Sequence, residues 1–249
     1  MINILWRNIK WRFQNPVSII ITILQPMIWL LLYSSIAGQS LPNKATGSYT
    51  AFILPGIMVL VIFSCSASSG FINYIMKSKG SFNRILIAPV SRISIVCGQL
   101  LEAVLLSFIE IIFLFILCIF LSVHLSPGFS NFLFIIILLF LTAFFMAGLS
   151  YSVSLWLPNE IIYETVMNTI ILPVFFLSTA LFPVENLSGT LKILVMLNPF
   201  THIINNLRSL LFGESIILEN TLPVIILFLV LCFGSFTLGV KSLKKENNQ

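Results

Sequence analysis

Long runs of uncharged, mostly apolar residues alternate with short polar stretches along this chain of 249 residues. A helix rises about 1.5 Å per residue and the hydrocarbon core of a bilayer is about 30 Å thick, so about 20 apolar residues can cross it. We therefore predict an all-α integral membrane protein, built as one transmembrane domain over residues 1–249. Its six expected membrane-spanning helices cover about residues 17–37, 51–75, 93–123, 132–157, 161–182 and 222–240.

The first 15 residues are amphipathic rather than uniformly apolar. Arg7 and Lys10 lie on one side of a helix drawn through them, and the other side carries Ile2, Leu5, Trp6, Ile9 and Phe13. This pattern predicts a helix lying in the membrane interface over residues 1–15, the alternative being a basic flank of the first span. Pro16 ends the element. The apolar run after it is too long for a typical signal peptide, so we favour an uncleaved anchor.

The stretch from 183 to 221 is long but not uniformly polar. Residues 191–197 are too few to span a bilayer, and after Asn198 and Pro199 the apolar side chains keep helical spacing. We expect one or two half-inserted or interfacial helices in this external re-entrant region.

Charge is scarce: only 8% of residues are charged while 58% are hydrophobic, and the net charge is +5. Ten of the thirteen Lys and Arg residues fall on the side of the six spans that also holds both termini, and the other three are Lys44, Lys192 and Arg208. By the positive-inside rule we expect both termini to be cytoplasmic. The expected location is the cell membrane of a bacterium. The excess positive charge is suited to membrane lipids rather than to nucleic acid.

A basic segment, residues 76–92, stands between the second and third spans and is cytoplasmic on this topology. It carries Lys77, Lys79, Arg84 and Arg92, and it also carries apolar side chains, Ile85 among them. The segment is too polar for lipid and too apolar for a loop that meets only water. We predict that it binds a soluble cytoplasmic partner.

Two acidic residues, Glu102 and Glu110, lie within the third apolar run. An ionisable group costs several kcal/mol in lipid unless it faces protein or water, so each is a candidate functional residue. Glu102 has an alternative place near the cytoplasmic interface. The small residues at 64–70 in the second span favour close helix packing over a ligand site.

Signatures of catalysis are missing from the sequence. No glycine is followed by lysine, which excludes a P-loop, and the chain contains no Asp. His124 and His202 stand apart, and the four cysteines show no C-x-x-C spacing, so they are expected to be small packing residues. We predict a protein that is not an enzyme, with no catalytic, cofactor or metal site of its own.

Three stretches carry a resemblance to the permease subunit of type-2 ABC exporters of drugs, lipo-oligosaccharides and polysaccharides. Residues 80–92 are similar to the family's cytoplasmic form G-x-x-E-R-L-x-x-x-P-V-S-R, although Asn83 stands where Glu is common. Residues 173–187 resemble the end of the family's fifth span. Residues 197–208 resemble its L-N-P-x-T signature with a following Arg.

The resemblance implies a complex of two permease chains, identical or homologous, with two ATP-binding subunits that carry the ATP and magnesium. Movement of the ATPase would reach the permease through Lys77, Lys79, Phe82, Arg84, Ile85 and Arg92. The first, second and fifth spans would line the path of an amphipathic or lipid-linked drug, peptide or glycan. The exit would be closed by an external gate formed by Phe175, Phe176, Phe182, Pro183, Asn198 and Pro199.

Two other classes of function stay open at this point. A self-contained secondary transporter or channel would use Glu110 to carry a coupling proton. A membrane scaffold would show no nucleotide-linked flux. The exporter subunit is the favoured hypothesis, because intramembrane charge is scarce and three motifs occur in the expected order.

Overall fold

The computed structural model describes residues 2–14, 16–40, 46–87, 89–121, 123, 125–184, 188–213 and 218–246, and in this part of the chain the regular structure is helical. The prediction of an all-α membrane protein is confirmed. The helices are α1 (Ile2–Phe13), α2 (Pro16–Ser40), α3 (Thr46–Ser78), α4 (Ser81–Ile87), α5 (Arg92–Phe120), α6 (Phe129–Trp156), α7 (Glu160–Phe176), α8 (Gly189–Leu197), α9 (Pro199–Leu211) and α10 (Leu218–Glu246).

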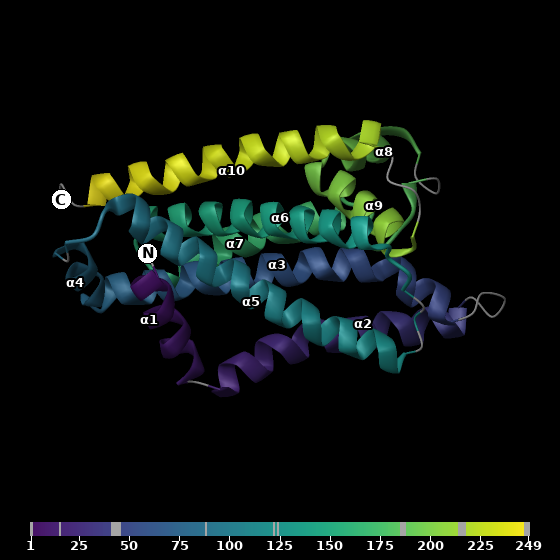
Figure 1. The fold of residues 1–249 in the computed structure, drawn as a ribbon, viewed down its shortest axis with the longest axis horizontal. Coiled ribbons are helices and arrows are strands. Elements are labelled where there is room, and N and C mark those ends of the chain that lie inside the picture. The colour runs from purple at the N-terminus through teal and green to yellow at the C-terminus, as the bar shows by residue number, and fades with distance from the viewer. Residues whose placement is uncertain are drawn as a thin grey trace.

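The long helices run along one common direction, with α3 and α6 inside the bundle (Figure 1). Both ends of the chain lie at the same end of the molecule as α4, and we call this the terminal end. Helices α8 and α9 lie at the opposite end, which we call the α9 end. The structure therefore separates the basic segment from the re-entrant region by the length of the bundle, as the alternation of spans predicts.

Four helices among the described residues are long and apolar enough to cross a membrane: Tyr49–Ser78, Arg92–Phe120, Phe129–Trp156 and Thr221–Lys245. Helix α7 is shorter, at 17 residues, and the described apolar part of α2 is Ile19–Ser35. In chain order, these four helices match the second, third, fourth and last predicted spans. That α2 and α7 also cross the membrane, which would make six spans, stays a prediction.

Local sequence signals explain where several helices begin and end. Pro16 is the first residue of α2, where a missing N–H costs nothing. The side chains of Ser91 and Asn159 accept hydrogen bonds from Ser94 N and Ile162 N, at 3.2 and 2.8 Å, and so cap α5 and α7. Two short helices, α8 and the amphipathic α9, lie in the stretch predicted to hold half-inserted helices.

The small residues of α3 allow close packing, as the sequence predicts. Ser150 of α6 donates a hydrogen bond to the carbonyl of Ser66 at 2.6 Å, and Tyr163 of α7 donates to the carbonyl of Ala67 at 2.8 Å. A Cβ atom at Gly70 would collide with both the Ser150 and Tyr163 hydroxyls. Backbone carbonyls of α3 thus bind side chains of two neighbouring helices, which is how spans associate without a hydrophobic drive.

Replacing Gly56 with Ala should destabilise the bundle by about 1–3 kcal/mol, the usual cost of overpacking. A Cβ there would lie 2.6 Å from the Cβ and 2.7 Å from the Cα of Ala180, so backbone would have to move. The control is Gly234→Ala on α10, where no neighbour lies within 4 Å and a small gain in stability is expected. Thermal unfolding of the detergent-purified protein measures both; equal midpoints would contradict the packing.

Candidate coupling site and translocation groove

Helix α4 is anchored by two apolar side chains of the basic segment. Phe82 and Ile85 are 1% and 5% exposed. They belong to an apolar cluster at the terminal end that also contains Ile4, Ile95, Val96, Leu100, Ala103, Ala147, Tyr151, Leu155 and Leu243. The cluster joins α1, α4, α5, α6 and α10, so these five helices are packed together at the terminal end.

The positive residues of the basic segment lie in different surroundings. Lys77 is half-buried and its Nζ donates to the carbonyl of Leu155 at 2.7 Å, near the end of α6, whereas Lys79 is exposed. Arg92 is half-buried at the start of α5. The side chain of Arg84 lies outside the described residues. Their role in binding an ATPase stays a prediction.

The face of α1 that packs against the other helices carries both apolar and polar side chains, and it is not the most apolar face of the helix. Ile4, Asn8 and Arg12, spaced four residues apart, are buried, while Ile2 and Trp6 are 72% and 67% exposed. The exposed apolar side chains agree with the prediction of an interfacial helix, since they are free to enter lipid. The sequence did not indicate that two polar residues, Asn8 and Arg12, are the ones packed inside.

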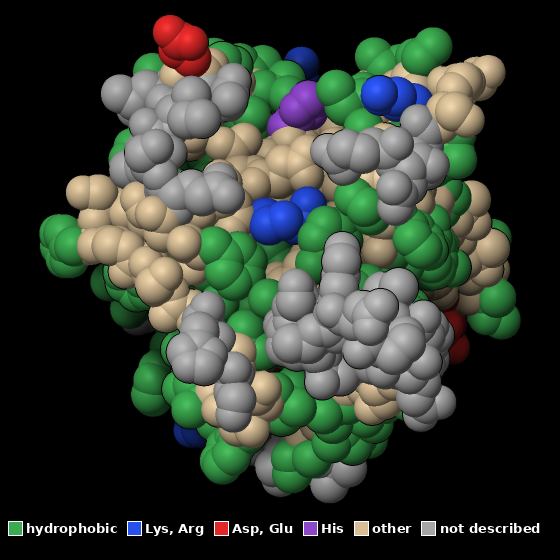
Figure 2. All heavy atoms as spheres, turned by 90° about the vertical axis from the view of Figure 1, so that its right-hand side faces the viewer, with side chains coloured by type: hydrophobic (Ala, Val, Ile, Leu, Met, Phe, Trp, Pro, Cys, Tyr) green, Lys and Arg blue, Asp and Glu red, His purple; other side chains and the backbone are tan. Residues whose placement is uncertain are grey.

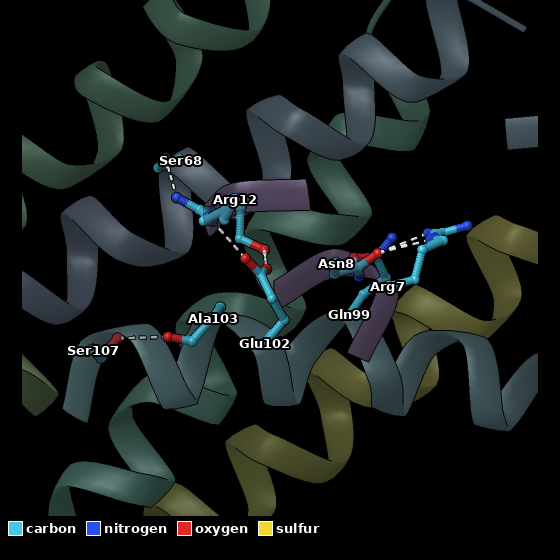
Figure 3. A network of polar contacts seen from close by, with 9 residues as sticks. Arg7, Asn8, Arg12, Ser68, Gln99, Glu102, Ala103 and Ser107 are labelled. Atoms are coloured by element: carbon cyan, nitrogen blue, oxygen red, sulfur yellow. Dashed lines mark hydrogen bonds and ion pairs between the residues drawn. The ribbon is translucent and has the colours of Figure 1, made fainter. Parts of the chain in front are cut away.

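Arg12 forms a buried ion pair with Glu102 of α5, with 2.6 Å between Nε and Oε1 (Figure 3). Nη1 of Arg12 donates to the Ser68 hydroxyl at 3.0 Å, and Ser69 donates to the other Glu102 oxygen. Glu102 is 3% exposed and lies where α1, α3 and α5 meet. It is therefore a fully paired structural acid inside the protein.

A second line of polar contacts runs beside the ion pair. Asn8 donates to Gln99 at 2.6 Å, Gln99 donates to Asn73 at 3.4 Å, and Asn73 donates to Ser154 at 2.8 Å. This line connects α1 with α5, α3 and α6. Helix α1 is thus tied by hydrogen bonds to α3 and α5, the helices that precede and follow α4 in the chain.

Glu110 lies two turns further along α5 and is 4% exposed. It is in contact with Cys65 of α3 and Thr22 of α2, and its Oε2 has no hydrogen-bond partner among the described residues.

No group of three or more His, Cys, Asp or Glu side chains able to hold a metal is found in the described part of the chain. All four cysteines are free and buried or half-buried, which agrees with a packing role.

A groove of about 200 Å³ lies between α2, α3 and α7. Two of these helices contribute aromatic rings. Trp29 and Tyr33 of α2 are stacked with centroids 5.6 Å apart, and Phe175 and Phe176 of α7 meet edge to face at the same distance. Polar side chains face the groove as well, namely Gln25, Ser64 and Asn168. These helices correspond to the first, second and fifth predicted spans, so the structure brings together the elements expected to line a path.

Asn198 connects α7 to α9 at the α9 end. Its Nδ2 donates to the carbonyls of Val174 and Leu177 at 2.6 and 2.7 Å, and its Oδ1 accepts from the N–H of Phe200 at 3.0 Å. One side chain thus satisfies carbonyls at the end of α7, just after Pro173, and an N–H at the start of α9. Pro199 follows as the first residue of α9.

The other residues predicted for the external gate differ in exposure. Phe175 is buried, whereas Phe176 and Phe182 are 57% and 59% exposed and Pro183 is half-buried. Phe175 and Phe176 line the groove; Phe182 and Pro183 lie beyond it in the turn after α7. A gating role for this set stays a prediction.

Arg208 was part of the recognised signature, but the sequence did not reveal its role. Its guanidinium lies 3.8 Å from the ring centroid of Phe52 and donates to the carbonyls of Phe52 and Thr179 at 3.2 and 2.7 Å. It therefore ties α9 to α3 and to the turn after α7.

Seen from the α9 end, basic and acidic side chains are few among apolar ones (Figure 2).

These features define a class: an all-α membrane protein with an aromatic and polar groove between helices, and with an apolar cluster that holds a short helix at one end. The chain belongs to the ABC-2 type transporter family, whose model matches residues 1–212. It is thus a transmembrane permease subunit of an ABC system. Such a subunit works with a separate ATP-binding subunit.

Several individual proteins are similar to this chain. The ycf38 transport permease of Cyanophora paradoxa is 32% identical over 213 residues, which cover 84% of this chain and 73% of that protein. The ycf38 transport permease of Porphyra purpurea is 31% identical, and the matched region covers 83% of this chain and 73% of that protein. The daunorubicin resistance ABC transporter permease protein DrrB1 of Streptomyces coeruleorubidus is 26% identical, and the matched region covers 85% of this chain and 74% of that protein.

Proposed function

We propose that this chain is the transmembrane subunit of an ATP-driven exporter and forms half of the translocation pathway for an amphipathic or lipid-linked substrate. Two copies, or one copy and a homologous chain, would assemble with two ATP-binding subunits. The terminal end would face the cytoplasm of a bacterial cell, with the α9 end outside. The positive residues flanking the spans at the terminal end support this orientation.

The observation that carries the proposal is the groove between α2, α3 and α7. Its aromatic rings and uncharged polar groups offer stacking and hydrogen bonds without a fixed charge. Such a surface suits amphipathic molecules better than small ions, which need charged or carbonyl-lined sites. The daunorubicin resistance permease DrrB1, by its name a drug-resistance protein, supports a cargo of this kind.

Filling the groove tests the proposal. In Ser64→Phe a large ring would occupy the space between α3 and α7, and substrate-stimulated ATP hydrolysis by the reconstituted complex should be lost while basal hydrolysis persists. The matched control is Ile112→Phe, an exposed position on α5. A panel of lipids, glycolipids, drugs and peptides serves as substrates. Stimulation of Ser64→Phe equal to wild type by every stimulating compound would rule out this groove as the path.

Reversing charge in the basic segment should release the ATP-binding subunit. In the double variant Arg84→Glu/Arg92→Glu, repulsion replaces attraction at the proposed contact, and co-purification with the ATPase should fall about tenfold or more. The control Lys244→Glu/Lys245→Glu makes the same change in net charge at exposed positions of the same end. Membrane insertion is checked by fractionation. Unchanged co-purification would refute the contact.

Neutralising Glu110 should leave export almost unchanged. Gln keeps the size of the side chain and its ability to contact Thr22 and Cys65, and the exporter draws its energy from ATP rather than from a proton on this acid. The measurement is ATP-dependent transport by Glu110→Gln in proteoliposomes. Complete loss of transport in a normally folded variant would favour a proton-coupled transporter instead.

A further inference from the structure

A second cleft, distinct from the groove, lies between α1, α3 and α5 at the terminal end. Its volume is about 340 Å³, and its lining includes Arg7, Asn8, Trp11, Arg12, Ile72 and Met76. It adjoins the Arg12–Glu102 pair, but the proposed translocation path does not use it. The first residue of α4, Ser81, also lines it, so the cleft borders the coupling helix.

One donor of the lining is buried without a partner. Arg12 is 6% exposed; its Nε and Nη1 are engaged by Glu102 and Ser68, and its Nη2 has no hydrogen-bond partner among the described residues. A buried charged donor left unsatisfied costs more than about 1–3 kcal/mol. Because Arg12 lines the cleft, an oxygen-rich anion bound there would lie beside this unsatisfied donor and offset part of that cost.

The charges and shape of the lining narrow the ligand class. Two arginines against one glutamate leave one net positive charge, and Glu102 is already satisfied by Arg12 and Ser69. Guanidinium groups bind phosphate oxygens with directed hydrogen bonds. The remaining lining is largely apolar, with Trp11, Ile72 and Met76, so the ligand carries one anionic group on an apolar body.

The side chains around the cleft are of the kinds found at a membrane interface. Helix α1 exposes Ile2 and Trp6, and Trp11 is 42% exposed at the cleft itself. Tryptophan beside arginine on an amphipathic helix is typical of the membrane interface. We infer that this cleft binds the phosphate group of an anionic glycerophospholipid, held by Arg7 and Arg12, with its glycerol and upper acyl chains against Trp11 and Met76.

Native mass spectrometry of the full complex with its ATP-binding subunit tests the inference. The complex is released from nanodiscs made of equal parts phosphatidylcholine and phosphatidylglycerol. Arg7→Ala should retain phosphatidylglycerol about tenfold less than wild type, as expected for loss of a charged hydrogen bond. Lys10→Ala, an exposed charge on the same helix that does not line the cleft, should retain it like wild type. Equal thermal midpoints show that both variants are folded.

Three results would overturn the site. Phosphatidylglycerol could be retained equally by wild type and Arg7→Ala, or phosphatidylcholine could be retained as well as phosphatidylglycerol. The assembled complex could retain no lipid, as when a segment of the ATPase fills the cleft. A separate arm uses phosphatidylcholine nanodiscs with inorganic phosphate. Arg7-dependent thermal stabilisation by phosphate alone would assign the cleft to a free anion instead of a lipid.

Discussion

Replacing Glu102 with Ala should destabilise the protein by about 3–5 kcal/mol, which is the cost of removing one partner from a buried ion pair. Arg12 would remain buried with its charge uncompensated, and Ser69 would lose its acceptor. We expect a lower thermal midpoint in detergent and loosening of α1, measured as faster hydrogen exchange over residues 2–14. Coupling of ATP hydrolysis to substrate should fall as well.

Two variants separate the loss of the pair from the loss of a carboxylate. Glu164→Ala removes an exposed carboxylate from α7 and should leave stability unchanged. Arg12→Met/Glu102→Leu replaces the pair with apolar side chains and should recover most of the lost stability, because the uncompensated charge is gone. If Glu102→Ala unfolds at the wild-type temperature, the ion pair does not hold α1 in place.

Replacing Asn198 with Ala should destabilise the α9 end by about 3 kcal/mol, because three buried or partly buried backbone groups lose their partner. A single such loss costs about 1–3 kcal/mol, and losses at neighbouring groups are not fully additive. The carbonyls of Val174 and Leu177 and the N–H of Phe200 are those groups. Hydrogen exchange over 199–211 and the thermal midpoint measure the effect.

A graded series tests whether both halves of this amide matter. Asn198→Ser keeps an oxygen able to cap α9 but is too short to reach the α7 carbonyls, so its stability should fall between wild type and Ala. Thr165→Ala is the control, since this exposed hydroxyl donates a hydrogen bond to the carbonyl of Ile161 in its own helix, at 2.8 Å. Equal stability of the Ser and Ala variants would show that the cap of α9 contributes nothing.

The sequence was a reliable guide wherever one short stretch contained the whole signal. Four long apolar runs match the four long helices, because burying backbone in lipid requires helices of that length. Asn198-Pro199 marks a helix start by itself, since Asn caps and Pro fits the first turn. The family could likewise be recognised from residues 80–92 and 197–208.

The roles of the polar residues could not be read in the same way. The amphipathic pattern of α1 correctly indicated an exposed apolar face, but only the position of α1 against α5 shows that Arg12 meets Glu102 from 90 residues away. Arg208 likewise finds its partners on α3 and beyond α7, at 156 and 29 residues along the chain. No local pattern encodes such pairs.

By itself, then, the sequence determined that the chain is a helical membrane protein, which four segments form helices long enough to cross a bilayer, and to which family it belongs. These properties depend on hydrophobicity and spacing within a single segment. The tertiary structure alone decided that Glu102 is paired, that α2, α3 and α7 enclose a groove, and that α1 packs in the same apolar cluster as α4. These properties depend on which side chains face each other once separate helices pack, and the burial that makes a polar pair strong exists only after packing.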